Sequence, residues 1–229
     1  MLMNFRRIFS ALLLAFSALG ALAQTPGSRI EFTTTMGNFT VVLFKETPEH
    51  AANFEKLVRE GFYTDILFHR TIRNFMVQAG DPDSRDVQPG QNLGEGGLPY
   101  TLPLELALPN IYHYRGALAA ARLGDEENPE RRSSSTQFYV VWGKTFSFSE
   151  ISAVKQRIAE ATGRTDIITP EMAADYEKRG GTPHLDGQYT VFGEVTEGLE
   201  VIERIQRVKT DRFNRPLEDV RILSAKVVE

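Results

Sequence analysis

The fold prediction depends most on the stretch FHRTIRNFMVQAGD, residues 68–81. With the residues just before it, the stretch is rich in apolar and aromatic side chains, which is typical of β-strands, and Arg73-Asn74 favours a bend between two of them. One arginine, Arg70, stands inside the apolar part. Such an arginine either keeps its charged head in water at a strand edge or has a function, and its neighbours leave both interpretations open.

Further strands are predicted on the C-terminal side. GALAAAR, residues 116–122, and STQFYVVW, residues 135–142, are expected to be neighbouring strands of one sheet, and YTVFGEV, residues 189–195, continues that sheet. Residues 81–101 are dominated by Gly, Pro, Asp and Asn, and residues 123–135 are polar and charged. Both segments are predicted to be surface loops that frame a site.

The N-terminal part predicts a hairpin and a helix. RIEFTTTMGNFTVVLF, residues 29–44, alternates apolar and polar residues around Met36-Gly37-Asn38, which indicates a β-hairpin. Thr47 is the expected N-cap of a helix with Pro48 at its first position, and Gly61 is expected to end that helix.

The C-terminal part predicts a second main helix at residues 198–208 and a final strand at residues 219–228. Residues 145–181 are predicted to form a helical insertion, whose helices could dock on the rest of the chain, shield a pocket rim, bind a partner or be a plain excursion. Short strands and two flanking helices without β-α-β alternation predict a mainly β chain, folded as a closed antiparallel barrel capped by two helices.

Composition limits the function. The chain has 229 residues, of which 41 % are hydrophobic and 24 % are charged. This length and apolar fraction allow one well-buried core or two small ones. Its net charge of −4 argues against nucleic acid as a partner. The sequence contains no cysteine, so disulfides and thiolate chemistry are excluded.

The first 23 residues are typical of a secretory signal peptide. Arg6 and Arg7 precede an apolar run, residues 8–23, that ends in Ala21-Leu22-Ala23. The run is shorter than the roughly 20 residues that a membrane-spanning helix needs. We expect cleavage after Ala23, no stable membrane insertion afterwards, and a secreted or periplasmic protein whose functional domain spans residues 24–229.

Metal and nucleophile chemistry have little support. The four histidines form no HExxH-like or i, i+4 pair, so no metal site is expected. The serines at 133–135 lack a Gly-x-Ser-x-Gly elbow, and the glycines at 94–97 fit no nucleotide-binding spacing. No cofactor is therefore expected.

The stretch 68–81 resembles the signature block of the cyclophilins, which are peptidyl-prolyl cis/trans isomerases. Three further segments resemble cyclophilin blocks in the same order: GALAAAR at 116–122, SSTQFYV at 134–140 and HLDGQYTVFGEV at 184–195. The resemblance covers nearly all of the chain after residue 23, apart from the insertion. It implies a closed, eight-stranded cyclophilin-like barrel that needs neither metal nor cofactor.

The resemblance also implies a site. Arg70 is implied to be the catalytic arginine, with Gln78 beside it. The other matching positions are implied to bind the substrate: Phe75, Met76, Ala121, Arg122, Gln137, Tyr139, His184, Leu185 and Tyr189. Ala121 and Arg122 match the pair whose backbone holds the residue before proline.

Three positions depart from the family pattern. His184 stands where eukaryotic cyclophilins typically carry a tryptophan that contributes to binding cyclosporin, so weak binding of that drug is expected. Tyr189 stands where histidine is common. Tyr139 replaces the usual phenylalanine, which adds a hydroxyl that needs a partner if it is buried.

The implied reaction suits these residues. Rotation about an X-Pro amide meets a barrier of about 18–20 kcal/mol because the nitrogen shares its lone pair with the carbonyl. A fixed guanidinium stabilises the twisted transition state, in which that lone pair is localised. We expect a monomeric isomerase acting on proline-containing polypeptides; the alternative is a non-catalytic cyclophilin-like module that binds proline-containing segments.

Overall fold

The computed structural model describes residues 26–88 and 91–228, so the predicted signal peptide and its cleavage site lie outside the described residues. The chain begins with the predicted hairpin, formed by β1 (Pro26–Thr34) and β2 (Gly37–Phe44). Gly37 at the turn has a φ of +120°, a conformation that glycine adopts without steric cost.

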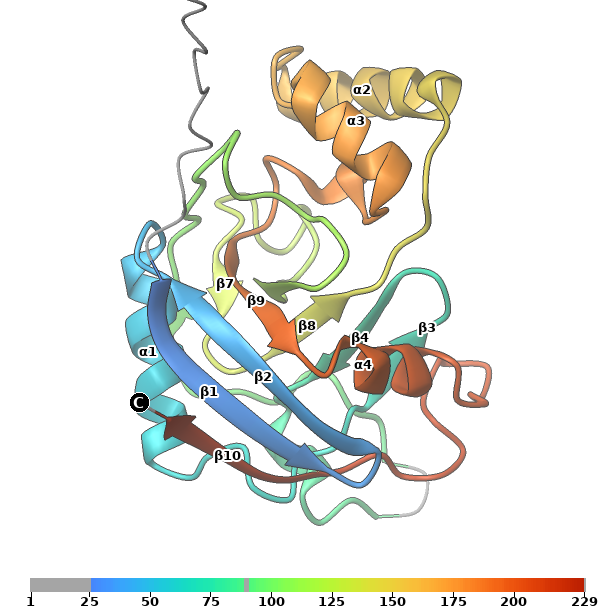
Figure 1. Ribbon diagram of the computed structural model, residues 1–229. Coiled ribbons are helices and arrows are strands. Elements are labelled where there is room, and N and C mark those ends of the chain that lie inside the picture. The colour runs from blue at the N-terminus through green and yellow to red at the C-terminus, as the bar shows by residue number, and fades with distance from the viewer. Residues whose placement is uncertain (1–25, 89–90, 229) are drawn as a thin grey trace, which may run out of the picture.

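Eight strands form one antiparallel sheet in the order β10-β1-β2-β9-β6-β8-β4-β3 (Figure 1). The strands after the hairpin are β3 (Arg70–Ile72), β4 (Met76–Ala79), β6 (Ala117–Ala120), β8 (Phe138–Val141), β9 (Val191–Glu197) and β10 (Ile222–Val228). The two predicted loops contribute a short separate pair, β5 (Thr101–Leu102) with β7 (Ser133–Ser134). Two short 3₁₀ turns, η1 (Pro82–Ser84) and η2 (Pro183–Leu185), complete the elements beside the helices.

The prediction of a closed barrel is wrong in one respect, because the curled sheet is open, with β10 and β3 at its edges. The chain before β3 links these edges: the Phe68 amide donates to the Val220 carbonyl and the Ile222 amide donates to the Ile66 carbonyl, each at 2.8 Å. β3 has only three residues, whereas β10 has seven, so the two strands do not pair along a continuous ladder. The hydrogen bonds from residues 66–68 therefore take the place of a strand ladder between β3 and β10.

Two helices, α1 (Pro48–Arg59) and α4 (Leu199–Gln206), bury their apolar sides in the main core, as predicted. This core includes Phe32, Phe39, Phe54, Phe138 and Phe192 from helix and strands. Burial of such side chains stabilises the fold by roughly 1.5–3 kcal/mol each.

Thr47 is the N-cap of α1, as predicted, but its side chain makes no capping hydrogen bond. A carboxylate from a distant loop takes that place: Glu105 accepts from the backbone amides of Glu49 at 3.1 Å and His50 at 3.0 Å. A negative charge at this position also interacts favourably with the helix dipole.

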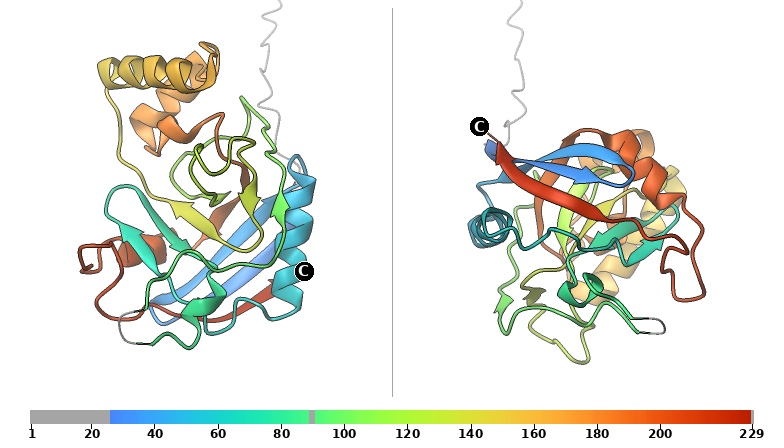
Figure 2. Two further views of the ribbon diagram at one scale, coloured as in Figure 1. Left: turned by 180° about the vertical axis from the view of Figure 1, so that it is seen from behind. Right: turned by 90° about the horizontal axis from the view of Figure 1, so that it is seen from below.

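The insertion folds as the two predicted helices, α2 (Phe148–Thr162) and α3 (Pro170–Lys178), at one end of the molecule (Figures 1 and 2). Their apolar sides share a small core, and Leu108 and Tyr112 from the adjoining loop pack against it. A bridge between Lys144 and Gly181 brings the ends of the insertion together. The insertion is therefore docked on the rest of the chain.

No helix within 26–88 or 91–228 is long and apolar enough to cross a lipid bilayer.

The two faces of the sheet carry different clusters of side chains. Val77 and Val140 belong to the main core, whereas their strand neighbours Met76 and Tyr139 belong to a second apolar cluster. This separation follows from the period of two along a strand, which points successive side chains to opposite faces. Residues of the second cluster line the site described next.

Candidate active site

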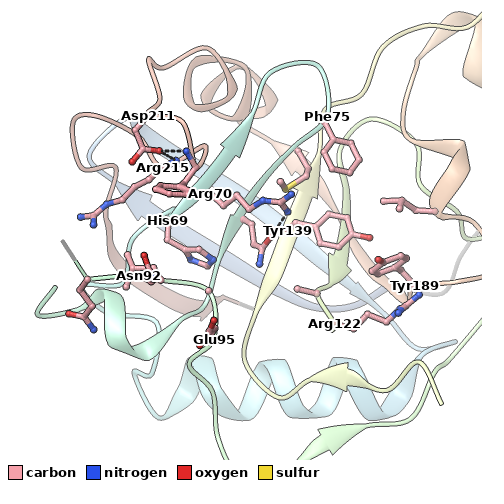
Figure 3. A pocket seen from close by; sticks show the side chains of 18 residues that line it. His69, Arg70, Phe75, Asn92, Glu95, Arg122, Tyr139, Tyr189, Asp211 and Arg215 are labelled. Carbon is pink, nitrogen blue, oxygen red and sulfur yellow. Dashed lines mark hydrogen bonds between the residues drawn. The ribbon is translucent and has the colours of Figure 1, made fainter. Parts of the chain in front are cut away.

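A cavity of about 720 Å³ lies along β3 and β4 and the nearby ends of β6 and β8 (Figure 3). Its lining residues are His69, Arg70, Phe75, Met76, Gln78, Gln91, Asn92, Leu93, Gly94, Glu95, Ala121, Arg122, Tyr139, Leu185, Tyr189, Asp211, Phe213 and Arg215. Six separate segments of the chain thus meet around one space, with Arg70 projecting into it (Figure 3).

The turn between β3 and β4 fixes Arg70 opposite Gln78. Asn74 adopts a φ of +58°, which asparagine tolerates better than most residues, and its amide donates to Oε1 of Gln206 in α4 at 2.9 Å. The Phe75 amide donates to the Ile72 carbonyl at 3.1 Å. This turn confirms the predicted bend at Arg73-Asn74.

A line of side-chain hydrogen bonds begins at Arg70. Nη1 of Arg70 donates to Oε1 of Gln78 at 3.2 Å, and Nε2 of Gln78 donates to Oε1 of Gln137 at 3.0 Å. Nε2 of Gln137 then donates to the carbonyls of Gly94 at 2.9 Å and Gly96 at 2.7 Å. The guanidinium is thereby connected to the loop on the far side of the cavity.

The charge of Arg70 is permanent. Partial burial lowers the pKa of its guanidinium, but arginine begins so high that it stays protonated at any physiological pH. Arg70 remains solvent-accessible, and its hydrogen bond to Gln78 uses one of its five N–H donors. It can therefore donate to a bound ligand while it keeps this bond.

Apolar and aromatic side chains form the wall beside Arg70. Met76 and Tyr139 are buried and Phe75 is half-buried, and Leu185 and Tyr189 pack against the same cluster. The Tyr139 and Tyr189 rings meet at 80° with their centroids 6.2 Å apart. This wall suits a compact apolar ring.

The hydroxyl of Tyr139 has a buried partner. It lies 3.0 Å from Nε2 of His113, and burial raises its pKa well above the ordinary value, so it stays protonated. The sequence indicates that such a partner is needed, and the structure identifies it as a residue 26 positions earlier.

The side chain of Arg122 is engaged within the protein. Its Nε donates to the Gln188 carbonyl at 3.0 Å, and its guanidinium lies over the Tyr189 ring at 4.3 Å. The Ala121 amide donates to the Gln137 carbonyl at 3.0 Å, and the Ala121 carbonyl accepts from the Ser134 amide at 2.8 Å. The single N–H of Ala121 is therefore already donated within the protein, so a backbone N–H from this pair to a ligand comes from Arg122.

Nine of the eleven residues that the resemblance implies line the cavity: Arg70, Phe75, Met76, Gln78, Ala121, Arg122, Tyr139, Leu185 and Tyr189. Gln137 lies behind Gln78 and lines an adjoining cavity of about 390 Å³. His184 does not line the cavity; its ring stacks on Phe75 with the centroids 5.5 Å apart and supports that ring from outside.

The sequence analysis missed His69, residues 91–95 and three residues of a C-terminal loop, Asp211, Phe213 and Arg215. The composition of residues 81–101 indicates a framing loop, but it does not single out 91–95. The loop at 211–215 carries no such signal. It reaches the site because the Thr71 amide donates to the Asn214 carbonyl at 2.8 Å.

A family model described as "Cyclophilin type peptidyl-prolyl cis-trans isomerase/CLD" matches residues 29–227. This chain belongs to the cyclophilin-type peptidyl-prolyl cis-trans isomerase family. Similar cyclophilins include the "Peptidyl-prolyl cis-trans isomerase-like 1" of Aspergillus fumigatus, 33 % identical over 87 % of this chain and 95 % of that protein. An isomerase of Arabidopsis thaliana is 31 % identical over 90 % of this chain and 99 % of its own length.

One relative is much longer. A Streptococcus pyogenes protein whose name combines a phosphatase with a peptidyl-prolyl cis-trans isomerase is 34 % identical over 89 % of this chain, which spans 39 % of that protein. A crystal structure of a Cryptosporidium parvum cyclophilin is similar with a TM-score of 0.61 and 20 % identity, covering 88 % of this chain and 98 % of that one. The family and the named relatives support peptidyl-prolyl cis-trans isomerase activity in this cyclophilin.

Proposed function

We propose that this cyclophilin rotates X-Pro bonds in unfolded or newly exported polypeptides outside the cytoplasm, and that it works as a monomer. The observation that carries the proposal is the position of Arg70, held by Gln78 at the edge of an apolar cavity and in reach of what that cavity binds.

The cavity wall is proposed to bind the pyrrolidine ring. Phe75, Met76, Leu185 and the Tyr139 ring offer apolar surface that removes the ring from water. A Cryptosporidium parvum cyclophilin of the same fold was crystallised in the presence of the dipeptide Ala-Pro, with a TM-score of 0.60 and 19 % identity to this chain. That ligand supports proline-containing peptides as the substrate class here.

Arg70 is the proposed catalytic residue. When the X-Pro amide twists, its nitrogen becomes pyramidal and its lone pair localises, so a guanidinium N–H donates to that nitrogen more strongly than in either planar state. No covalent bond forms or breaks. A ten-thousand-fold acceleration takes about 5.4 kcal/mol, which one charge-assisted hydrogen bond with exclusion of water and orientation can supply.

The residue before proline must be held while the proline ring turns relative to it. Since the backbone N–H of Ala121 is already bonded to Gln137, we assign this contact to the backbone of Arg122. The Arg122 side chain, fixed on Gln188 and Tyr189, keeps that backbone in place. Rotation is then confined to one bond.

The proposed location rests on the sequence of residues 1–23, with their arginines, apolar run and Ala-Leu-Ala ending. Expression of the full sequence in a secreting bacterial host, followed by N-terminal sequencing of the exported protein, tests it. The expected first residue is Gln24. Retention of Met1 on a cytoplasmic product would contradict the proposed location.

The activity is tested by NMR exchange kinetics on a short Ala-Pro peptide, comparing residues 24–229 with Arg70→Ala at matched concentration. The unsubstituted protein is expected to accelerate cis/trans exchange, and Arg70→Ala to lose most of the acceleration while it still binds the peptide. If both proteins bind the peptide and neither accelerates exchange, the chain is a proline-binding module and the proposed activity is wrong.

A further inference from the structure

Four buried side chains form a continuous line of hydrogen bonds from the apolar wall to the insertion. The Tyr139 hydroxyl lies 3.0 Å from Nε2 of His113, and Nδ1 of His113 lies 2.8 Å from Oδ1 of Asp186. The Tyr176 hydroxyl donates to Oδ2 of Asp186 at 2.7 Å. None of the four residues is more than 5 % exposed.

The direction of the hydrogen bonds at Asp186 follows from the carboxylate. Oδ1 of Asp186 accepts from the His113 backbone amide at 2.9 Å and faces Nδ1, so Nδ1 carries the proton. A ring that carries only this proton accepts from the Tyr139 hydroxyl at Nε2, and a ring protonated on both nitrogens donates to the same hydroxyl. In either form the line joins Tyr139 to His113 and His113 to Asp186, with Tyr176 donating to Asp186 from the other side.

Tyr176 ties this line to the insertion. It lies on α3, is fully buried, and its ring contacts Tyr112 at 5.4 Å and Phe146 at 6.3 Å between centroids. Burial, together with the nearby Asp186 carboxylate, raises the pKa of its hydroxyl, so it stays a donor. Through Tyr176 the insertion thus donates a hydrogen bond to the Asp186 carboxylate, which orients His113.

The other end of the line lies at the proposed proline pocket. In Figure 3 the Tyr139 hydroxyl points away from Arg70, so the ring is what borders the space beside the guanidinium. The His113 and Tyr139 rings stack at 14° with centroids 6.1 Å apart. His113 therefore holds both the hydroxyl and the ring plane of Tyr139.

We propose that Tyr176 of the inserted helix α3 is a positioning residue for proline binding, acting through Asp186 and His113 to fix the Tyr139 ring. This inference deepens the proposed function and rests on it. Loss of the Tyr176 hydroxyl leaves one carboxylate oxygen unpaired, so Asp186 and His113 gain freedom and the Tyr139 ring loses its fixed plane. The effect falls on peptide affinity, because Arg70 is held separately by Gln78.

The test is a double-mutant cycle on residues 24–229, read by NMR exchange with an Ala-Pro peptide. Tyr176→Phe is expected to raise the half-saturating peptide concentration about threefold to tenfold, with the exchange rate at saturation unchanged within about twofold. In a Tyr139→Phe background the same substitution is expected to have no further effect, because the line is already broken.

Tyr112→Phe is the matched control. It removes a hydroxyl that donates to Asp175 of α3 at 2.8 Å, so it loosens the same insertion while it keeps the ring that packs on Tyr176 and every hydrogen bond of the line. It is expected to leave peptide affinity unchanged. An affinity change for Tyr176→Phe that persists in the Tyr139→Phe background, or no change at all, would overturn the proposal.

A second measurement uses the unsubstituted protein, in case Tyr176→Phe does not fold. Nitrogen-15 spectra of the His113 ring, assigned by comparison with His113→Gln, are expected to show a proton on Nδ1; a ring whose Nδ1 carries no proton would also overturn the proposal. If the unsubstituted protein binds the peptide but does not accelerate exchange, the proposed activity is refuted. The positioning role of Tyr176 is still tested in that case, because the double-mutant cycle can be measured from peptide affinity alone.

Discussion

Arg70 and Gln78 face each other across the β3–β4 hairpin, and Nη1 of Arg70 donates to Oε1 of Gln78 at 3.2 Å. The orientation of the Gln78 side-chain amide is set from the opposite side of the cavity. Gly94 and Gly96 offer carbonyls, which only accept, so Gln137 must present its NH₂ group to them. Its oxygen then accepts from Gln78, whose own oxygen is left for Arg70.

Arg70→Lys keeps the positive charge and removes the planar fork. A single flexible ammonium cannot keep the Gln78 bond and donate to the proline nitrogen in a fixed geometry. The exchange rate at saturation is expected to fall on the order of 10²–10³-fold, with peptide affinity little changed. Arg59→Lys, on the exposed face of α1, is the control and should behave as the unsubstituted protein. Full activity in Arg70→Lys would show that charge alone suffices.

Gln137→Leu tests the order of the amide line. The substitution leaves the Gly94 and Gly96 carbonyls without this donor and frees the Gln78 amide to rotate. The exchange rate at saturation is expected to fall about tenfold, equivalent to roughly 1.4 kcal/mol, while Arg70 itself is unchanged. Retention of the full rate would mean that Gln78 is oriented by other contacts.

Glu105→Gln tests the unexpected cap of α1. The Glu49 amide donates to Oε1 and the His50 amide to Oε2, so glutamine keeps one acceptor oxygen and presents an NH₂ group in place of the other. The free energy of unfolding is expected to fall by about 1–2 kcal/mol in urea denaturation. Glu203→Gln, which breaks only a surface pair with Arg207, should change it by less than about 0.5 kcal/mol. Equal effects of the two substitutions would contradict the capping role.

Acidification from pH 7 to pH 5 is expected to destabilise the fold through buried histidine. Burial, partly offset by the nearby Asp81 carboxylate, lowers the pKa of His69 from 6.5 to about 4. Between these values the unfolded chain takes up a proton that the folded chain does not, so stability is present above about pH 6.5 and is lost as the pH falls. For this one group the slope is at most about 1.4 kcal/mol per pH unit.

Urea denaturation at pH 7, 6 and 5 measures this slope, and His69→Gln should flatten it. The window stops at pH 5 so that protonation of carboxylates contributes little. Burial also lowers the pKa values of His50 and His184, so a smaller slope of the same sign should remain in the variant. An unchanged slope in His69→Gln would show that the other groups account for it.

Cyclosporin is expected to bind weakly. The sequence places histidine at 184, and the structure shows its ring stacked on Phe75 and outside the cavity lining. Direct titration of the drug measures the affinity, and His184→Trp is expected to raise it at least tenfold. Tight binding by the unsubstituted protein would refute this expectation.

Much of the fold and site could be predicted because the signals are local. Strand alternation, the Met36-Gly37-Asn38 turn and helical spacing are properties of neighbouring residues, and the structure confirms the hairpin, both capping helices and the two helices of the insertion. The resemblance placed Arg70 and its apolar neighbours correctly around one cavity. The roles of these residues in binding and catalysis stay predictions.

The errors involve partners that lie far apart in the chain. Local pattern correctly indicated Thr47 as the N-cap of α1, but the side chain that accepts from the first-turn amides is Glu105, more than fifty residues away. Closure of the barrel depends on pairing between β10 and β3, which lie about 150 residues apart in the chain, and no local pattern encodes such pairing. The loop at 211–215 joins the cavity only through its contact with β3.

The sequence by itself determined the strands of the main sheet and the four helices, the family resemblance and the arginine available for the reaction, because each depends on residue type and short-range spacing. Only the tertiary structure decided that the sheet stays open, that Gln137 orients Gln78, and that Tyr139 is joined through His113 and Asp186 to Tyr176. His113 and Asp186 are 73 positions apart, and a hydrogen bond forms only when folding brings such groups within about 3 Å of each other.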